Sequence, residues 1–208
     1  MITISSLTLL GAQRDKLRES ARLLGRSMRD NPINIRTFGI RDAEHRSRSL
    51  TRFFESVLRG LSQRGMIFAA FDDGTMVGVY CMTPRGRCQP TPLEKLRLFP
   101  SVIFGNSVGT SLRVMRWAGE WSRRDLFEPH WHLGPVAVDS HLQKRGIGGI
   151  MMADFCARVD DKAVLSYLET DKSENVRFYE KFGFLVMDEA KVLGVRNWFM
   201  SRPARNAT

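Results

Sequence analysis

The chain contains little cysteine and no long apolar run, and both absences limit what kind of protein it is. Its three cysteines, Cys81, Cys88 and Cys156, form no CxxC pair. An odd count with this spacing is not typical of a disulfide-stapled secreted domain, so we expect a reducing, cytoplasmic location. No stretch approaches the ~20 apolar residues of a membrane-spanning helix. No basic leader precedes the first short apolar run, so we expect neither a signal peptide nor a membrane partner.

Acidic residues are also scarce relative to basic ones. Asp and Glu total 22, Lys and Arg total 32, and the formal net charge is +10. Hydrophobic residues make up 43% and charged residues 26% of the 208 positions, which is typical of a globular chain and excludes whole-chain disorder. This length is ordinary for one domain with its own core. We therefore expect a single domain over residues 1–208.

The basic excess is unevenly distributed along the chain. Residues 1–64 carry 13 basic and 6 acidic groups, and residues 85–124 carry 8 and 2. Residues 139–208 are nearly balanced, with 11 and 10. Such an excess is typical of proteins that bind nucleic acid, anionic membranes or polyanionic ligands. Because 25 of the 32 basic residues are arginine, bidentate pairing with phosphate or carboxylate is favoured.

The first half of the chain alternates between helical and strand patterns. Residues 2–9 suggest a strand, and a helix is predicted over 17–28 by apolar positions three and four residues apart. Asn31-Pro32 and Gly39 are interpreted as marking the end of that helix. A second helix is predicted to begin at Asp42, and strands 66–71 and 75–82 to form a hairpin. Arginines also recur every four residues along the first helix: Arg14, Arg18, Arg22 and Arg26. They form either a solvated helix face or one that binds an anion or a partner.

The second half contains a proline-broken segment followed by a regular α/β pattern. Residues 84–128 are too apolar for a linker and too long for a plain loop, so we interpret them as a helical insertion. After it, strands and helices alternate, as in α/β folds. The expected order is strand 132–138, helix 146–159, strand 163–169, helix 173–182 and strands 184–190 and 196–200.

The most informative stretch is the junction between a strand that ends at Asp139 and a helix that opens on glycines. Gln143, Gly146 and Gly148 follow the pattern Q-x-x-G-x-G, with Lys144 and Arg145 between them. Glycines allow a phosphate to approach the backbone, and the first amides of a helix are unpaired donors. The spacing matches neither the dinucleotide fingerprint nor the P-loop. The junction therefore predicts an anion site of another kind.

In this context the Q-x-x-G-x-G stretch resembles the acetyl-coenzyme A pyrophosphate loop of the GNAT superfamily of N-acetyltransferases. The segments Leu168–Asp171 and Asn175–Phe184 resemble the second part of that family's pattern, so the resemblance covers residues 132–200. It implies an α/β (α+β) fold: a mixed, mostly antiparallel sheet with a central splayed parallel strand pair, flanked by helices. The helical insertion then precedes the fourth strand.

The resemblance also implies an acetyl-CoA-binding core. Backbone groups of the strand would hydrogen-bond the pantetheine arm, and loop amides would bind the pyrophosphate. Asn175 would contact the pantetheine or the tyrosine after it, although it stands four residues before that tyrosine where many family members have seven, so a helix-start role is the alternative. The other implied cofactor-binding residues are Val136, Ala137, Val138, Gln143, Lys144, Arg145, Gly146, Ile147, Gly148 and Gly149.

Three residues are candidates for the chemistry of acetyl transfer. Tyr179 matches the family's general-acid position, where a phenol protonates the departing thiolate. Glu169, at a strand end, is one candidate base for the incoming amine, and His132 is the competing one. His130 and His132 share a strand face, but no third ligand stands at metal-site spacing, so no metal is expected.

The resemblance implies acetyl transfer from acetyl-CoA to an amine by direct attack. We expect a small-molecule amine first and a protein amine second, and a monomer or homodimer. The alternative is a nucleic-acid-binding module, or a regulatory acyl-CoA sensor, on the same fold. Nucleic acid is not required to explain the charge, because coenzyme A is itself polyanionic. Most of the excess lies outside the loop, which leaves a partner surface, an anionic acceptor or solvation to explain it.

Overall fold

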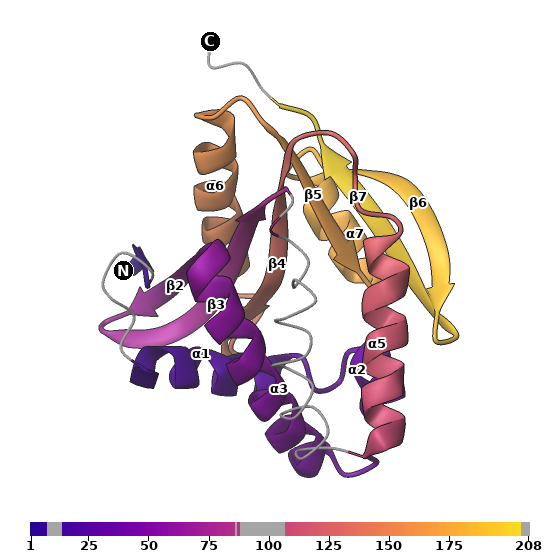
Figure 1. The fold of residues 1–208 in the computed structure, drawn as a ribbon. Coiled ribbons are helices and arrows are strands. Elements are labelled where there is room, and N and C mark those ends of the chain that lie inside the picture. The colour runs from indigo at the N-terminus through magenta and orange to yellow at the C-terminus, as the bar shows by residue number, and fades with distance from the viewer. Residues whose placement is uncertain (8–13, 86, 88–106, 205–208) are drawn as a thin grey trace.

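A computed structural model describes residues 1–7, 14–85, 87 and 107–204 (Figure 1). Seven strands form one sheet in the order β1-β2-β3-β4-β5-β7-β6. The strands are β1 Ile2–Ser6, β2 Met66–Asp72, β3 Thr75–Pro84, β4 His130–Val138, β5 Leu165–Thr170, β6 Leu185–Val192 and β7 Val195–Arg202. The helices are α1 Arg14–Ser27, α2 Pro32–Phe38, α3 Ala43–Arg64, α5 Val108–Ser122, α6 Ile147–Asp160 and α7 Ser173–Glu180, with a short 3₁₀ turn over Ser140–Leu142.

The sheet is antiparallel except at its centre, where β4 and β5 run parallel. They are paired only from His130, opposite Leu165, to His132, opposite Tyr167. Beyond these residues the two strands diverge, and β4 continues to Val138 paired with β3 alone among the described strands. This mixed sheet with a splayed central pair confirms the expected fold class.

A bulge in β4 lies where the two strands part. Tyr80 faces Val136 and Met82 faces Leu133, so Gly134 and Pro135 together oppose one β3 residue. An extra residue bends a strand and redirects the side chains after it. Proline suits this place because it lacks the N–H that a regular ladder needs.

Helices cover both faces of the sheet. The core under α6 and α7 contains Tyr80, Leu168 and Met200, whereas alternate strand residues face α1 and α3 on the other side. A third cluster, on the same side as α1 and α3, joins Tyr167 and Phe199 to α2 and α5. Because neighbouring residues of a strand point to opposite faces, His132 lies opposite Leu133 and therefore on the α2 and α5 side.

The helix starts show what the sequence patterns captured and what they missed. Asp42 caps α3 as predicted, its side chain accepting a hydrogen bond from the His45 amide at 2.6 Å. Asn31-Pro32, interpreted from the sequence as a helix end, instead begins α2. Proline is favoured at a first helical position because the missing N–H has no partner there anyway. Gly39 then ends α2 with a left-handed φ of 65°.

The predicted insertion at 84–128 is partly covered by the structure. Within it α5 is helical, with Ser107 as its cap. Residues 86 and 88–106 lie outside the described residues, as does Cys88. In the part of the chain that the structure describes, no helix combines the length and apolar character that crossing a membrane requires.

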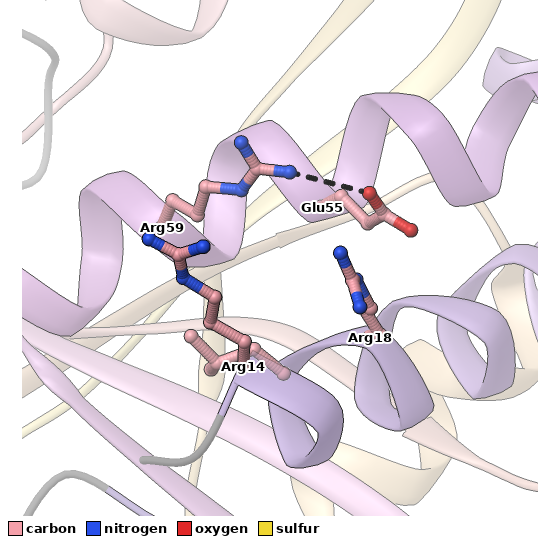
Figure 2. A pocket seen from close by; sticks show the side chains of 5 residues that line it. Arg14, Arg18, Glu55 and Arg59 are labelled. Carbon is pink, nitrogen blue, oxygen red and sulfur yellow. Dashed lines mark hydrogen bonds and ion pairs between the residues drawn. The ribbon is translucent and has the colours of Figure 1, made fainter. Parts of the chain in front are cut away.

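The arginine stripe of α1 divides between two environments. Arg14 and Arg18 line a cavity of about 290 Å³ against Glu55 and Arg59 of α3, where Arg59 bonds Glu55 (Figure 2). At the other end of the stripe, Arg26 forms an ion pair across to Asp139, after β4. The stripe is therefore neither wholly solvated nor one continuous anion-binding face.

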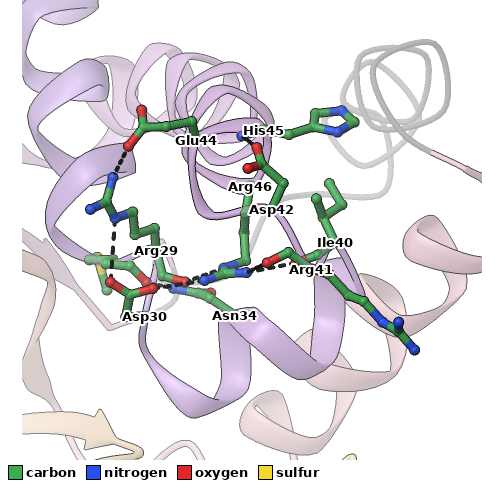
Figure 3. Close-up of polar contacts among 10 residues, drawn as sticks. Arg29, Asp30, Asn34, Ile40, Arg41, Asp42, Glu44, His45 and Arg46 are labelled. Carbon is green, nitrogen blue, oxygen red and sulfur yellow. Dashed lines mark hydrogen bonds and ion pairs between the residues drawn. The ribbon is translucent and has the colours of Figure 1, made fainter.

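Arg46, in the basic N-terminal half, is buried and has a structural role. Arg46 is only 5% exposed, and its guanidinium donates to the Arg29 and Ile40 carbonyls at 2.6 Å and to Asp30 at 2.7 Å (Figure 3). A buried guanidinium is tolerated only when such acceptors replace its water. Arg46 thus joins the connections at both ends of α2 to α3.

Candidate active site

The two competing base candidates lie together where β4 and β5 begin to diverge. His132 Nε2 is 2.7 Å from Glu169 Oε2, and the Glu169 side chain is 3% exposed against 14% for His132. Because both groups are nearly shielded from water, their interaction is much stronger than that of a surface pair. The sequence presented them as alternatives, and the structure makes them one hydrogen-bonded pair.

A second histidine supports this pair through an aromatic ring. Tyr167 lies between His130 and His132, with ring centroids 5.6 and 5.7 Å away. His130 Nε2 is 3.0 Å from Asp125 Oδ1, and its Nδ1 is 2.8 Å from the Glu128 carbonyl. Burial by itself would raise the pKa of Asp125, but the close contact with His130 outweighs it and holds that pKa low.

The β4 edge beyond the bulge carries backbone polar groups that β3 does not use. The Asp139 amide donates to the Val77 carbonyl at 2.9 Å, which fixes the alternation of the antiparallel ladder. Residues in such a ladder point their N–H and C=O alternately toward and away from the partner strand. Ala137 is therefore bonded to β3, whereas Val136 and Val138 direct theirs toward the diverging β5 side.

The glycine loop forms the turn into α6, as the motif predicts. Gly146 is the N-cap with φ 82°, and Lys144 before it has φ 63°. Ile147, Gly148 and Gly149 form the first turn of the helix. A Cβ placed on Gly146 or Gly149 would meet open space, whereas one on Gly148 would lie 3.4 Å from Phe178 Cζ. First-turn amides have no intrahelical acceptor, so open space beside them suits an anion.

The loop is anchored to the rest of the fold by an ion pair that sequence reasoning did not identify. Arg26 Nη2 lies 2.6 Å from Asp139 Oδ2, and Asp139 also accepts from the His141 amide at 3.2 Å. Burial opposes the charge of Asp139, but these two donors lower its pKa. Gln143 reaches back to the Val138 carbonyl at 3.4 Å. Only the i, i+4 arginine spacing on α1 hinted at this contact.

The general-acid candidate, Tyr179, is buried in the last turn of α7. It is 8% exposed and packs against Phe178 and Phe184, with ring centroids 5.4 and 5.9 Å away. Burial, with a smaller contribution from the charge of Asp171, raises the pKa of Tyr179 to about 12. The phenol therefore stays protonated at neutral pH and is available as a donor.

Asn175 lies at the junction of β5 and α7. Its side-chain amide donates to Thr170 Oγ1 at 3.1 Å, and α7 begins at Ser173 with Lys172 as its N-cap. Ser173 is therefore the first helical residue and Asn175 the third. Asn175 thus holds the end of β5 against the start of α7.

Asp171, which follows β5, is a buried carboxylate that sequence reasoning did not single out. It accepts a hydrogen bond from the Ile33 amide at 2.7 Å, and burial raises its pKa. This bond fixes the first turn of α2 beside the strand end that carries Glu169. Among the described residues, no three His, Cys, Asp or Glu side chains are grouped closely enough to hold a metal ion.

Comparison with known proteins adds a family and a set of folds. The family model described as "Acetyltransferase (GNAT) family" matches residues 33–184. A Corynebacterium glutamicum structure described as histone acetyltransferase HPA2 and related acetyltransferase superposes with TM-score 0.70 at 22% identity, over 100% of this chain and 98% of that one.

Two further solved structures share the fold at lower identity. A Drosophila melanogaster polyamine N-acetyltransferase, which forms N-acetylagmatine, has TM-score 0.65 at 14% identity over 98% and 100% of the two chains. A ribosomal-protein-alanine N-acetyltransferase from Escherichia coli has TM-score 0.58 at 15% identity over 100% and 97%. At these identities the likeness concerns the fold.

Proposed function

This chain belongs to the acetyltransferase (GNAT) family, and from that premise we propose that it transfers an acetyl group from acetyl-CoA to an amine, using His132 and Glu169 as one base. The observation that carries the proposal is the place of this pair. It lies where β4 and β5 part, on the α2 and α5 side of the sheet.

The residues of the loop and of β4 fit the donor. Val136 and the N–H of Val138 offer the pantetheine arm backbone groups that β3 does not use, with Ala137 holding the strand to β3. The loop amides from Lys144 to Gly149, Ile147 and Gly148 among them, would hold the pyrophosphate, with the exposed side chains of Gln143, Lys144 and Arg145 beside it. Acetyl-CoA supplies the acetyl group as a thioester.

The chemistry requires one bond to form, one to break and two protons to move. The amine nitrogen bonds the acetyl carbon as the carbon–sulfur bond breaks. The nitrogen loses a proton to the His132–Glu169 pair, and the thiolate gains one from Tyr179. A backbone N–H near Val138 would stabilise the negative charge on the carbonyl oxygen.

The two catalytic roles fall on opposite faces of the sheet. His132 and Glu169 lie on the α2 and α5 side with Tyr167, whereas Tyr179 packs in the core under α6. An acceptor approaching from the α2 and α5 side would therefore meet the base first. We infer a small-molecule amine as the acceptor, with a protein amine as second choice.

Release of free thiol from acetyl-CoA, measured for the purified chain with a panel of small amines and amine-bearing peptides, tests this function. We expect release with at least one amine, and its loss in Glu169→Gln. Coenzyme A binding measured by calorimetry separates the alternatives. Binding without release with any acceptor would favour an acyl-CoA sensor, and absence of binding would refute the donor assignment.

A further inference from the structure

A groove on the acceptor side of the sheet gathers positive charge that the fold leaves uncompensated. It has a volume of about 510 Å³ and lies between α2, α5 and the β6–β7 hairpin turn. Four cationic residues and one glutamate line it: Arg36, Arg113, Arg116, Lys191 and Glu120. Most of these cations come from the segments whose basic excess the coenzyme A loop does not explain.

The single carboxylate of the groove is already paired elsewhere. Glu120 contacts Arg123 at 2.7 Å and Arg124 at 3.0 Å. The hydrogen bonds from Arg124 and Arg123 lower the pKa of Glu120 and keep it ionised for them. It therefore does little to offset the four cations.

Two of these cations are oriented by neutral acceptors instead of carboxylates. Arg36 Nε donates to the Leu193 carbonyl at 3.0 Å. Arg113 Nε donates to the Thr37 carbonyl at 2.6 Å, and its Nη2 to Thr110 Oγ1 at 3.0 Å. Such bonds fix a guanidinium without neutralising it, and leave other N–H groups for a ligand. Within the described ranges, none of the four cations pairs with a carboxylate.

The groove is physically joined to the proposed catalytic pair. The start of α2 is bonded to Asp171, two residues after Glu169. On β7, Phe199 pairs with Glu169, and Arg196, opposite Lys191, lies three residues earlier. Lys191 also lies two strands across the sheet from Glu169, so three residues along the strand and two strand spacings of about 4.8 Å place their backbones roughly 14 Å apart.

We propose that this groove binds an anionic group, phosphate or carboxylate, carried by the acceptor amine. Resting on the proposed function, this assigns the acceptor class as an extended amine with a distal negative charge. Like charges held close together repel, and an anion relieves that repulsion while forming bidentate bonds with the arginines. Arginine suits both anions because its planar fork matches two oxygen atoms at once.

The test compares amines that differ only in their far end: n-alkylamines, ω-aminoalkanoates and ω-aminoalkylphosphonates over a series of chain lengths. Binding to the full chain is measured by calorimetry with coenzyme A saturating, so that the glycine loop is filled. Thiol release is measured in parallel. We expect at least one anionic probe to bind about tenfold more tightly than its alkylamine match. The carboxylate and phosphonate arms show which anion is preferred.

The variants separate the groove from the general charge of the protein. Arg116→Gln with Lys191→Gln should reduce the anion preference about tenfold. Arg22→Gln with Arg48→Gln removes the same charge from exposed positions outside the groove and should leave the preference unchanged. Equal affinity for charged and neutral probes, or equal loss in both double variants, would overturn the proposal even if thiol is released. If no amine releases thiol, the binding arm still decides it.

Discussion

Single and double replacement of His132 and Glu169 tests whether they act as one base. Glu169→Gln retains the size of the side chain but removes its charge from a site that is 3% exposed. General-base catalysis contributes about 10²–10⁴ in rate, which corresponds to roughly 3–5 kcal/mol of transition-state free energy. Each single variant should lose kcat within that range. Because the 2.7 Å bond makes one unit, His132→Asn with Glu169→Gln should lose no more than the worse single variant.

The result that would refute this reasoning is multiplication of the two losses, to about 10⁴–10⁸ in kcat. The assay is thiol release with the best acceptor from the amine panel. Raising the pH toward the pKa of that amine should restore part of the loss, because the acceptor then arrives already deprotonated. Losses that do not respond to pH would place the pair outside proton transfer.

Unfolding by urea, followed by circular dichroism, provides the control for folding. A hydrogen bond to a buried charged group contributes about 1.5–3 kcal/mol, so each single variant should lose stability of that order. The double variant should lose less than the sum of the two. This coupling is measurable without an acceptor.

Four further outcomes follow from particular contacts. Tyr179→Phe should lower kcat more than it weakens coenzyme A binding, and wild-type turnover would remove the tyrosine from the acid role. Gly146→Ala should lower the free energy of unfolding by about 1 kcal/mol, because Gly146 has a left-handed φ, and should also weaken coenzyme A binding. Gly149→Ala should weaken binding as well but raise the free energy of unfolding by up to about 1 kcal/mol. Urea titration measures the stabilities and calorimetry the affinities. Asp171→Asn, which keeps an acceptor without the buried charge, should be at least as stable as the parent, whereas Asp171→Ala should lose about 1–3 kcal/mol; equal losses would contradict this. Because the pKa of Asp139 is lowered in the folded state, its contribution to stability is complete above the ordinary carboxyl pKa of ~3.9 and is lost as the pH falls further. Asp139→Asn should therefore flatten the decline of stability, measured by urea unfolding, between about pH 5 and 2. An unchanged slope would count against the ion pair.

The local chemistry of the chain was accessible from sequence because it depends on neighbours along the chain. The Q-x-x-G-x-G turn into α6, the cap at Asp42 and the alternation of strands and helices all follow from backbone rules over a few residues. The missed helix α2 is short, and its proline was interpreted as a stop when it marks a start. Proline is compatible with both, and only packing of Ile33 against Tyr167 and Phe199 selects one.

The sequence by itself therefore determined the family and the glycine turn into α6, and it named the residues proposed to bind pyrophosphate and to move protons. Only the tertiary structure decided that His132 and Glu169 are one pair, that Arg26 anchors the loop, and that some of the described basic residues, such as Arg46, are buried while others line the groove between α2 and α5. The physical reason is distance. These partners are 37 residues apart or more, or lie on separate elements, and only the register of the sheet and the packing of its helices brings them together.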